Sequence, residues 1–507
     1  LPSPIGDAAR GRGVAAPICA TPPVEGSASL RTPHWPVLSL AGLLALKLVL
    51  MLAAPPLGDE AYYWMWGQAL DWSYHDHPPL NAWLLRLSFE LFGWNRFALR
   101  APTLVSFAMS VGLMLWWARR LPRQAGGRAA ALLVLLASPL FLIFGSIVFP
   151  DHLLIALSML GVHFFVLYSG SVEDGAPRHR LLYGAALAVG LAALSKYSAL
   201  FVGLGFVGWF LATATGRGAL RSPHVWAAGA LALAVQAPVA WWNLVHDMET
   251  LRFHFHDRID GSTAPLAVIG RVAVFAVLGL AMASPPLAVA FARLLRASGG
   301  WEQRTFRIVG AGALAAALLA FVALGLRTQI YFYWIIPALV PLLPVAVAFF
   351  GPRLLKTHAV YGTIIAALLT LHLSVIPLPA LVGIRTAEEI SFGWAQVAER
   401  VEEEAKRHDA QLLLATQYNL AALLGFELGR TDVYSIAERA EQYDIWFDPA
   451  AHAGSDAILL ADADRPVNSS HDATFESVEP IGEVEVRAFG LLVHRYFLYL
   501  GRGLRSR

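Results

Sequence analysis

Two acidic residues follow directly after the first long apolar segment of the chain. Asp59 and Glu60 lie in the run Gly58–Trp64, where aromatic side chains such as Tyr63 surround them in sequence. Acidic groups are costly to hold near lipid, which favours a chemical role for this pair. A carboxylate beside aromatic walls can have a pKa suited to accepting a proton, so Asp59 is a candidate general base. The simpler alternative is a pair of solvated carboxylates at a helix end.

A second acid occupies a comparable position further along. Asp151 follows Phe149 and Pro150 at the outer end of the third predicted span, with almost no loop around it. Two acids from different spans, at one membrane depth and on one side, are placed to converge on one cavity. We therefore expect Asp151 to be a second catalytic residue, and Glu60 and Tyr63 to contact substrate.

The run His75, Asp76, His77 precedes two prolines. Two histidines and an aspartate so close together are candidate ligands of a divalent metal. Side chains alternate along an extended segment, so at most His75 and His77 point the same way. Two alternatives stay open: a loop stiffened by Pro78 and Pro79, or a site in which Asp76 and His77 hold a substrate phosphate or carboxylate.

Cationic and aromatic residues gather in other predicted outer segments. Lys196 lies between two spans in a chain that has few lysines, and is either a snorkelling side chain or a cation for a lipid phosphate. Arg252 and Arg258 alternate with aromatic residues, and arginine suits two-point contact with phosphate, although an interfacial anchoring belt has the same composition. Arg327 and Tyr331 form a weaker cluster of the same kind.

The composition predicts the elements that position these residues. The chain has 507 residues, of which 57% are hydrophobic and 15% are charged, against about 25% charged in a typical soluble protein. These values indicate a polytopic α-helical membrane protein, and the net charge of +2 gives no support for a nucleic-acid partner. About eleven spans of suitable length are predicted. They cover 37–54, 97–118, 129–147, 152–169, 181–194, 198–214, 225–243, 266–292, 308–326, 331–350 and 359–378.

Arginine placement predicts the orientation. Arginine-rich loops alternate with loops rich in acids, and the arginine-rich set is expected on the cytoplasmic side. The acidic motif then faces outward, in a long loop at 55–96 whose apolar spacing suggests two short amphipathic helices lying in the interface. Residues 1–36 lack periodicity and are expected to be a disordered tail before a retained span at 37–54, although a signal peptide is a competing interpretation.

The composition changes near residue 383. Predicted strands at 411–415, 432–436, 457–460 and 484–499, with a helix at 419–428, indicate a small α/β domain. The predicted organisation is therefore a tail (1–36), a transmembrane catalytic domain (37–382) and a soluble α/β periplasmic domain (383–507).

These residue types suit a sugar carried on a polyprenyl phosphate. Phosphate is already a good leaving group, so the protein must supply cations to stabilise it and a base for the acceptor hydroxyl. Asp59 would supply the base, and Lys196 with the loop arginines the cations. One base and no enzyme nucleophile suffice for an inverting single displacement.

Several segments in order resemble the membrane glycosyltransferases of the C-type (GT-C) fold, in the family-39-like branch. That branch includes lipid A galacturonosyltransferases and is related to aminoarabinose transferases and protein O-mannosyltransferases. The resemblance lies in Gly58–Trp64, Asp76–Leu80, Phe149–Asp151, Gly190–Tyr197, Pro238 with Trp242 and Asn243, and Gln442–Trp446.

The resemblance implies a polyprenyl-phosphate sugar donor, a catalytic aspartate at Asp59 and a second functional aspartate at Asp151. His77 stands where the aminoarabinose transferases carry lysine, which puts their phosphate clamp and any metal in doubt for this chain. No cofactor is certain, and a divalent metal remains an option.

We therefore expect an inverting glycosyltransferase of the bacterial inner membrane. Its partners would be a polyprenyl-phosphate sugar donor, a lipid A, lipopolysaccharide or other envelope glycan acceptor on the periplasmic side, and membrane lipids. A protein O-mannosyltransferase is the alternative within enzymes. A transporter or lipid flippase is the alternative of another class, but it would be expected to place ionisable groups near the bilayer midplane.

Overall fold

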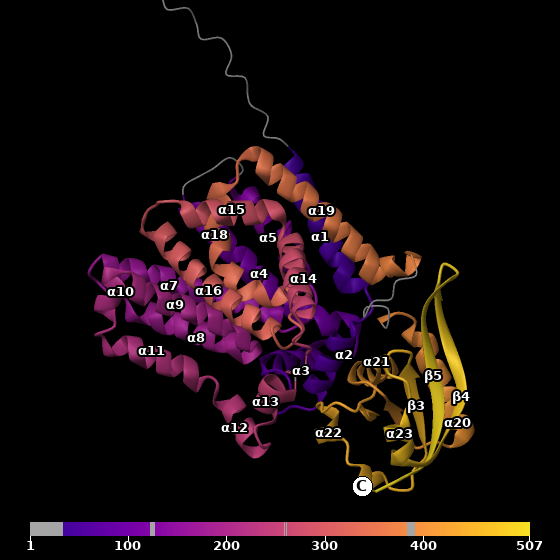
Figure 1. Cartoon of the computed structure of the whole chain (residues 1–507). Helices are drawn as coiled ribbons and strands as arrows, with labels where there is room; N and C mark the ends of the chain where they lie inside the picture. The colour runs from indigo at the N-terminus through magenta and orange to yellow at the C-terminus, as the bar shows by residue number, and fades with distance from the viewer. Residues whose placement is uncertain (1–33, 122–126, 258, 260, 383–390, 507) are drawn as a thin grey trace, which may run out of the picture. The chain divides into compact units, whose positions relative to one another are not determined.

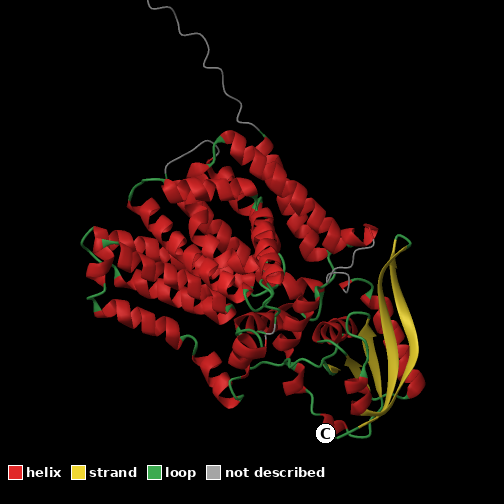
Figure 2. Ribbon diagram, in the orientation of Figure 1, coloured by secondary structure: helices red, strands yellow, loops and turns green. Residues whose placement is uncertain are grey.

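The computed structural model describes residues 34–121, 127–257, 259, 261–382 and 391–506. Nearly all of the predicted N-terminal tail lies outside this part. Helices make up most of the described residues up to 382, and a five-stranded sheet with its own helices follows (Figures 1 and 2). The helices before residue 200 are α1 (Trp35–Leu52), α2 (Gly58–Gln68), α3 (Leu80–Phe92), α4 (Arg96–Arg120), α5 (Gly127–Leu136), α6 (Pro139–Phe144), α7 (Asp151–Glu173), α8 (His179–Ser195) and the 3-10 turn η1 (Tyr197–Ala199).

The helical part continues to residue 382. It consists of α9 (Leu200–Ala212), α10 (Ala214–Ala219), α11 (Pro223–Ala234), α12 (Ala237–Val245), α13 (Glu249–Arg252), the π-helical turn η2 (Phe253–Asp257), α14 (Pro265–Ala283), α15 (Pro285–Arg296), α16 (Trp301–Gly325), η3 (Phe332–Ile335), α17 (Ile336–Leu339), η4 (Val340–Leu342), α18 (Leu343–Ala346), η5 (Val347–Phe349), α19 (Pro352–Ser374) and η6 (Leu378–Val382).

Each predicted apolar segment is helical, but not all are long enough to count as spans. Among the described residues, seven helices are long and apolar enough to cross a membrane, and the pair α11 and α12, bent by 46°, makes up to eight. The helices over 127–136, 179–195 and 197–212 are shorter. The structure thus shows a multi-pass membrane protein, while crossing by the three short helices stays a prediction.

The span predicted at 266–292 is present as α14, but its predicted end is wrong, because the helix breaks after Ala283. α14 ends at Ala283, Ser284 has a φ of +84°, and α15 starts at Pro285. The two prolines at the start of α15 cannot donate backbone hydrogen bonds to a continuing helix. α15 carries Arg293 and Arg296 in its last turn and is a separate amphipathic helix.

Small residues let the helices approach one another closely. α7 packs along α8, and α9 along α16. A Cβ atom added at Gly205 would lie 2.4 Å from the backbone oxygen of Val309, so only glycine permits this contact between α9 and α16. The rings of Phe165 and Phe206 stack with centroids 4.0 Å apart in the adjoining core.

Two helices occupy the predicted long loop, as expected. However, α2 is not an interfacial helix with one exposed face, because nine of its 11 residues are buried. The C-terminal part of the chain covers it, through helix α21 (Tyr418–Leu428). The sequence pattern of α2 is therefore that of a helix enclosed on several sides.

The C-terminal part is an α/β layer with mixed strands. Its other elements are α20 (Trp394–His408), β1 (Leu412–Ala415), β2 (Val433–Ser435), α22 (Tyr443–Trp446), η8 (Pro449–His452), β3 (Ala457–Asp462), α23 (Ser469–Thr474), β4 (Phe475–Ala488) and β5 (Leu491–Leu504). The sheet order is β2-β1-β3-β5-β4; β1 pairs in parallel with β2 and β3, whereas β5 pairs antiparallel with β3 and β4.

The predicted strands and helix of this part are present. The segment 484–499 forms not a single strand but parts of β4 and β5, which turn at Phe489 and Gly490, both with positive φ. Residues 35–507 form one compact unit. The predicted boundary between 382 and 383 adjoins the segment 383–390, which lies outside the described residues.

Candidate active site

Glu60 fixes the start of α2 to the rest of the helical part. Arg100 of α4 donates to Glu60 through Nε (2.9 Å) and Nη2 (2.5 Å), and both side chains are buried. The backbone N–H groups of Val148 (2.9 Å) and Leu57 (3.1 Å) also donate to this carboxylate. These contacts occupy both oxygens of Glu60, which indicates an anchoring role instead of the expected substrate contact.

Asp59, the neighbouring residue, has a different environment. It lies in the first turn of α2, where the helix dipole favours an anion. The Tyr418 hydroxyl donates a hydrogen bond of 2.9 Å to Asp59 Oδ1. Burial raises the pKa of Asp59 above its usual value, while Tyr418 and the positive charge of Lys196 oppose that rise. A carboxylate with a raised pKa is a better proton acceptor once ionised.

Asp151 and Lys196 form a buried ion pair. Asp151 is the first residue of α7, and Lys196 follows the last residue of α8. Lys196 Nζ donates to Asp151 Oδ2 at 2.6 Å, and both side chains are at least nine-tenths buried. The Ser195 hydroxyl donates to the Pro150 carbonyl at 2.7 Å, which holds these helix ends together.

Lys196 connects the two predicted catalytic acids. Its charge acts on Asp59 as well as on Asp151. Lys196 Nζ also lies 4.7 Å from the centre of the Tyr333 ring, and the Tyr333 hydroxyl is within electrostatic range of both acids. Residues from the start of α2, the start of α7 and the end of α8 therefore share one charged neighbourhood.

Tyr63 lies within electrostatic range of Asp59. Burial raises its pKa well above the usual value, with further contributions from the charges of Asp59 and Asp76. Its ring centroid is 5.7 Å from that of His77 and 5.9 Å from that of Phe149. Tyr63 therefore lies near Asp59, Asp76 and His77, and substrate contact by these residues stays a prediction.

The predicted metal ligands do not form a metal site. His75 is buried, with Nδ1 3.3 Å from Glu249 and its ring against Phe253, whereas the His77 ring faces Tyr63. No group of three or more metal-ligating side chains occurs among the described residues. Because these side chains have different neighbours, we derive no step through a metal.

Three of the remaining predicted substrate-binding residues are exposed. Arg252 is exposed, with Nη1 3.8 Å from Glu249, and Arg327 is also exposed. Tyr331 is 42% exposed, and its ring is tilted against that of Tyr333, with the centroids 5.8 Å apart. Arg258 lies outside the described residues.

The C-terminal part contributes residues to this site that the sequence did not predict. Besides Tyr418, the backbone N–H of Gln442 donates to the Tyr62 hydroxyl at 3.0 Å, and Gln442 Oε1 accepts from the His75 backbone at 2.8 Å. Gln442 lies in one of the segments that carry the resemblance, so a signal existed for it. No local pattern marked Tyr418 or Tyr333.

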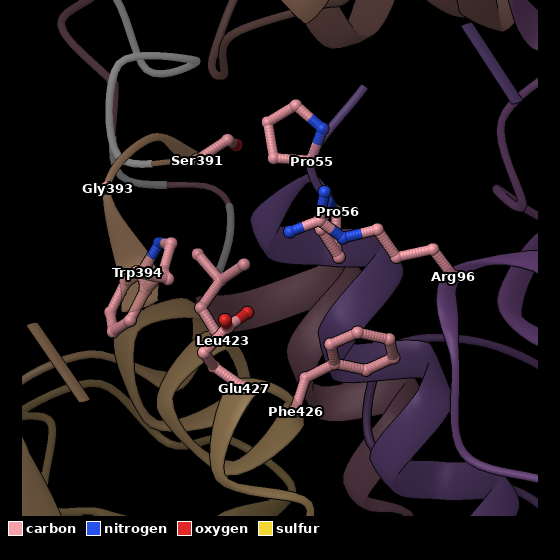
Figure 3. Close-up of a pocket in the computed structure, with 9 residues that line it drawn as sticks. All are labelled: Pro55, Pro56, Arg96, Ser391, Gly393, Trp394, Leu423, Phe426 and Glu427. Atoms are coloured by element: carbon pink, nitrogen blue, oxygen red, sulfur yellow. The ribbon is translucent and has the colours of Figure 1, made fainter. Parts of the chain in front are cut away.

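A small pocket marks the junction between the two parts of the chain (Figure 3). Pro55 and Pro56, just before α2, face Trp394, Leu423 and Phe426 across a volume of about 40 Å³. Ligand pockets usually measure about 300–1,000 Å³, so this volume is too small for a sugar. The pocket is a feature of the junction and not a substrate site.

Comparison with known proteins gives two sequence matches. Residues 76–242 match the family model described as dolichyl-phosphate-mannose-protein mannosyltransferase. The chain is 35% identical over 198 residues to the lipid A galacturonosyltransferase RgtD of Rhizobium johnstonii, a match that covers 38% of this chain and 40% of that relative. The matched region thus spans less than half of the relative's length.

Solved structures extend the similarity to almost the whole chain. ArnT from Cupriavidus metallidurans in the apo state matches with a TM-score of 0.61 and 18% identity, over 92% of this chain and 98% of that one. The same protein bound to undecaprenyl phosphate matches with a TM-score of 0.59 over the same shares. Together with the sequence matches, this fold identifies the chain as a multi-pass membrane protein with the GT-C glycosyltransferase fold.

Proposed function

We propose that this protein is an inverting glycosyltransferase that moves a sugar from a polyprenyl-phosphate carrier to lipid A, lipopolysaccharide or a similar envelope glycan. It would act on the periplasmic side of a bacterial inner membrane, where arginine placement puts the acidic site. The names of its relatives support the proposal: one is a lipid A galacturonosyltransferase, and another was solved with undecaprenyl phosphate.

In the proposed reaction, an acceptor hydroxyl attacks the anomeric carbon of the donor sugar. The bond between that carbon and the phosphate oxygen breaks, and the phosphate leaves with the electron pair. Asp59 takes the proton of the attacking hydroxyl. The Lys196 ammonium, which pairs with Asp151, offsets the negative charge on the phosphate. One displacement inverts the anomeric configuration.

The buried lysine between two carboxylates is the observation that carries the proposal. Lys196 pairs with Asp151 and acts on Asp59, and all three lie at or next to helix ends, not in the middle of a span. A transporter would be expected to place such groups near the bilayer midplane. The position at helix ends favours chemistry at the membrane surface.

A protein O-mannosyltransferase is the second candidate. The description of the family model over residues 76–242 favours it. It would use the same base and the same class of donor, with a serine or threonine hydroxyl as the acceptor. The two candidates therefore differ in the acceptor and not in the chemistry.

The substitution Asp59→Asn tests the proposed base. In reconstituted protein supplied with polyprenyl-phosphate sugars and lipid A, transfer should fall by about 10²–10⁴-fold, since an amide cannot accept the proton. Glu90→Gln is the matched control: it makes the same carboxylate-to-amide change on a largely exposed side chain of α3. Full activity in Asp59→Asn would remove this residue from the mechanism.

Mass spectrometry of envelope glycolipids identifies the product. Cells with and without the gene should differ by one sugar on a glycolipid, and its mass distinguishes a hexose, a pentose and a uronic acid. Loss of the sugar from an envelope protein instead would favour the mannosyltransferase.

A further inference from the structure

We propose that Tyr418 is a positioning residue for Asp59, so that the C-terminal α/β part completes the active site instead of only covering it. The proposal rests on the function proposed above. It assigns a role to a residue 359 positions away from the base in sequence.

The fold of the C-terminal part directs Tyr418 to the base. β1 ends at Ala415, and Tyr418 is the first residue of α21, beyond the carboxyl end of a strand in the parallel part of the sheet. Carboxyl ends of parallel strands are where such sheets commonly present functional groups. The Tyr418 ring packs on Tyr62 with centroids 4.5 Å apart, and its hydroxyl reaches Asp59 at 2.9 Å.

Several contacts hold this tyrosine in place. α21 packs along α2, and Trp94 Nε1 donates to the Phe426 carbonyl of α21 at 2.8 Å. A Cβ added at Gly425 would lie 3.1 Å from the Met65 side chain, which shows how closely the two helices meet. Gln442 forms a second connection to α2 through the Tyr62 hydroxyl. These contacts hold α21, and with it Tyr418, against α2.

The contact has a direct chemical consequence. The hydrogen bond from the Tyr418 hydroxyl to Oδ1 fixes the rotation of the Asp59 carboxylate. Oδ2 is then left to take the proton from the hydroxyl of the sugar acceptor. The charge of Asp59 keeps the pKa of Tyr418 well above its usual value, so this hydroxyl stays protonated and donates throughout the working range. The same hydrogen bond favours the ionised, basic form of Asp59.

Other charged groups around the Tyr418–Asp59 contact both raise and lower the pKa of Asp59. Glu60 favours the neutral form of Asp59, whereas Lys196 favours the ionised form. The acids Asp76 and Glu441 face Tyr418. The tyrosines Tyr63 and Tyr333 also face the base.

Tyr418→Phe tests the proposal, because it removes only the hydroxyl and keeps the ring on Tyr62. We expect kcat to fall by about tenfold, the order expected for a hydrogen bond to a charged group, with little change in the KM for the donor. Removing this hydrogen bond raises the pKa of Asp59 further. The acid limb of the pH–rate profile should therefore move to higher pH, by roughly one unit.

Tyr434→Phe is the matched control. Tyr434 belongs to β2 of the same sheet, and its ring packs on Phe447 instead of α2. Removing the Tyr434 hydroxyl should leave kcat and the pH–rate profile unchanged. If Tyr418→Phe keeps the wild-type kcat and acid limb while Asp59→Asn is inactive, the positioning role fails and the proposed glycosyltransferase function stands.

A measurement without substrate separates the two proposals. Infrared titration follows the protonated carboxyl band that disappears in Asp59→Asn. Tyr418→Phe should raise the midpoint of this band, and an unchanged midpoint would overturn the positioning role. This titration gives its answer even if the wild-type protein transfers no sugar from a polyprenyl-phosphate donor, in which case only the proposed function fails.

Discussion

The two ends of helix α7 hold acidic residues in opposite environments. At its start, the buried Asp151 pairs with the buried Lys196. At its end, Glu173 pairs with Arg304 of α16, whose side chain is 44% exposed. Solvent screens the Glu173–Arg304 pair, whereas the buried Asp151–Lys196 pair interacts strongly and is costly to break.

The same contrast holds for the neighbouring helix. α4 begins near Arg100, which is buried with Glu60, and ends with Arg120, which pairs with Glu302 and is 45% exposed. Burial, and not the kind of charge, therefore distinguishes the ion pairs at the end that carries the proposed site from those at the opposite end. Three substitutions test this difference.

Removing Lys196, the cation at the end of the helical part that carries the proposed site, should have the largest effect. Lys196→Ala takes away the group that we expect to offset the phosphate charge, and it leaves Asp151 buried without its partner. We expect kcat/KM for the donor to fall at least about 100-fold. Steady-state kinetics with donor and acceptor varied separately measure this, and Lys356→Ala, at an exposed lysine of α19, is the control. Unchanged donor kinetics would argue against a phosphate contact.

Breaking the structural pair at the same end should destabilise the fold. Arg100→Ala leaves Glu60 with a buried charge and removes hydrogen bonds to the carbonyl groups of Leu50 and Ala54. The expected loss is about 3–5 kcal/mol of unfolding free energy. Thermal unfolding in lipid nanodiscs measures it, and a wild-type Tm would refute the anchoring role of the pair.

Breaking a pair at the opposite end should change little. Arg120→Ala removes the partner of Glu302, and we expect at most about 1 kcal/mol of destabilisation and full transfer activity. The same unfolding and transfer assays apply. A loss as large as that of Arg100→Ala would contradict the difference drawn between the two ends.

Local patterns in the sequence determined much of the fold. Long apolar runs predicted a helix for every candidate span, since crossing a bilayer requires about 20 apolar residues. Short strand patterns at 411–415 and 457–460 predicted the parallel core of the C-terminal sheet. The break after Ala283 was missed, because the apolar run continues across Ser284, whose positive φ is not visible in hydropathy.

The sequence by itself also marked Asp59, Asp151 and Lys196, because charged residues are rare beside apolar spans. It predicted Asp59 as the base and Glu60 as a substrate contact, but it did not reveal that Glu60 is held by Arg100 and Asp59 by Tyr418. Only the tertiary structure paired Glu60 with Arg100 and brought Tyr418 to Asp59. The contact of Tyr418 with Asp59 arises from the packing of α21 on α2, and the local sequence around either residue does not encode that packing.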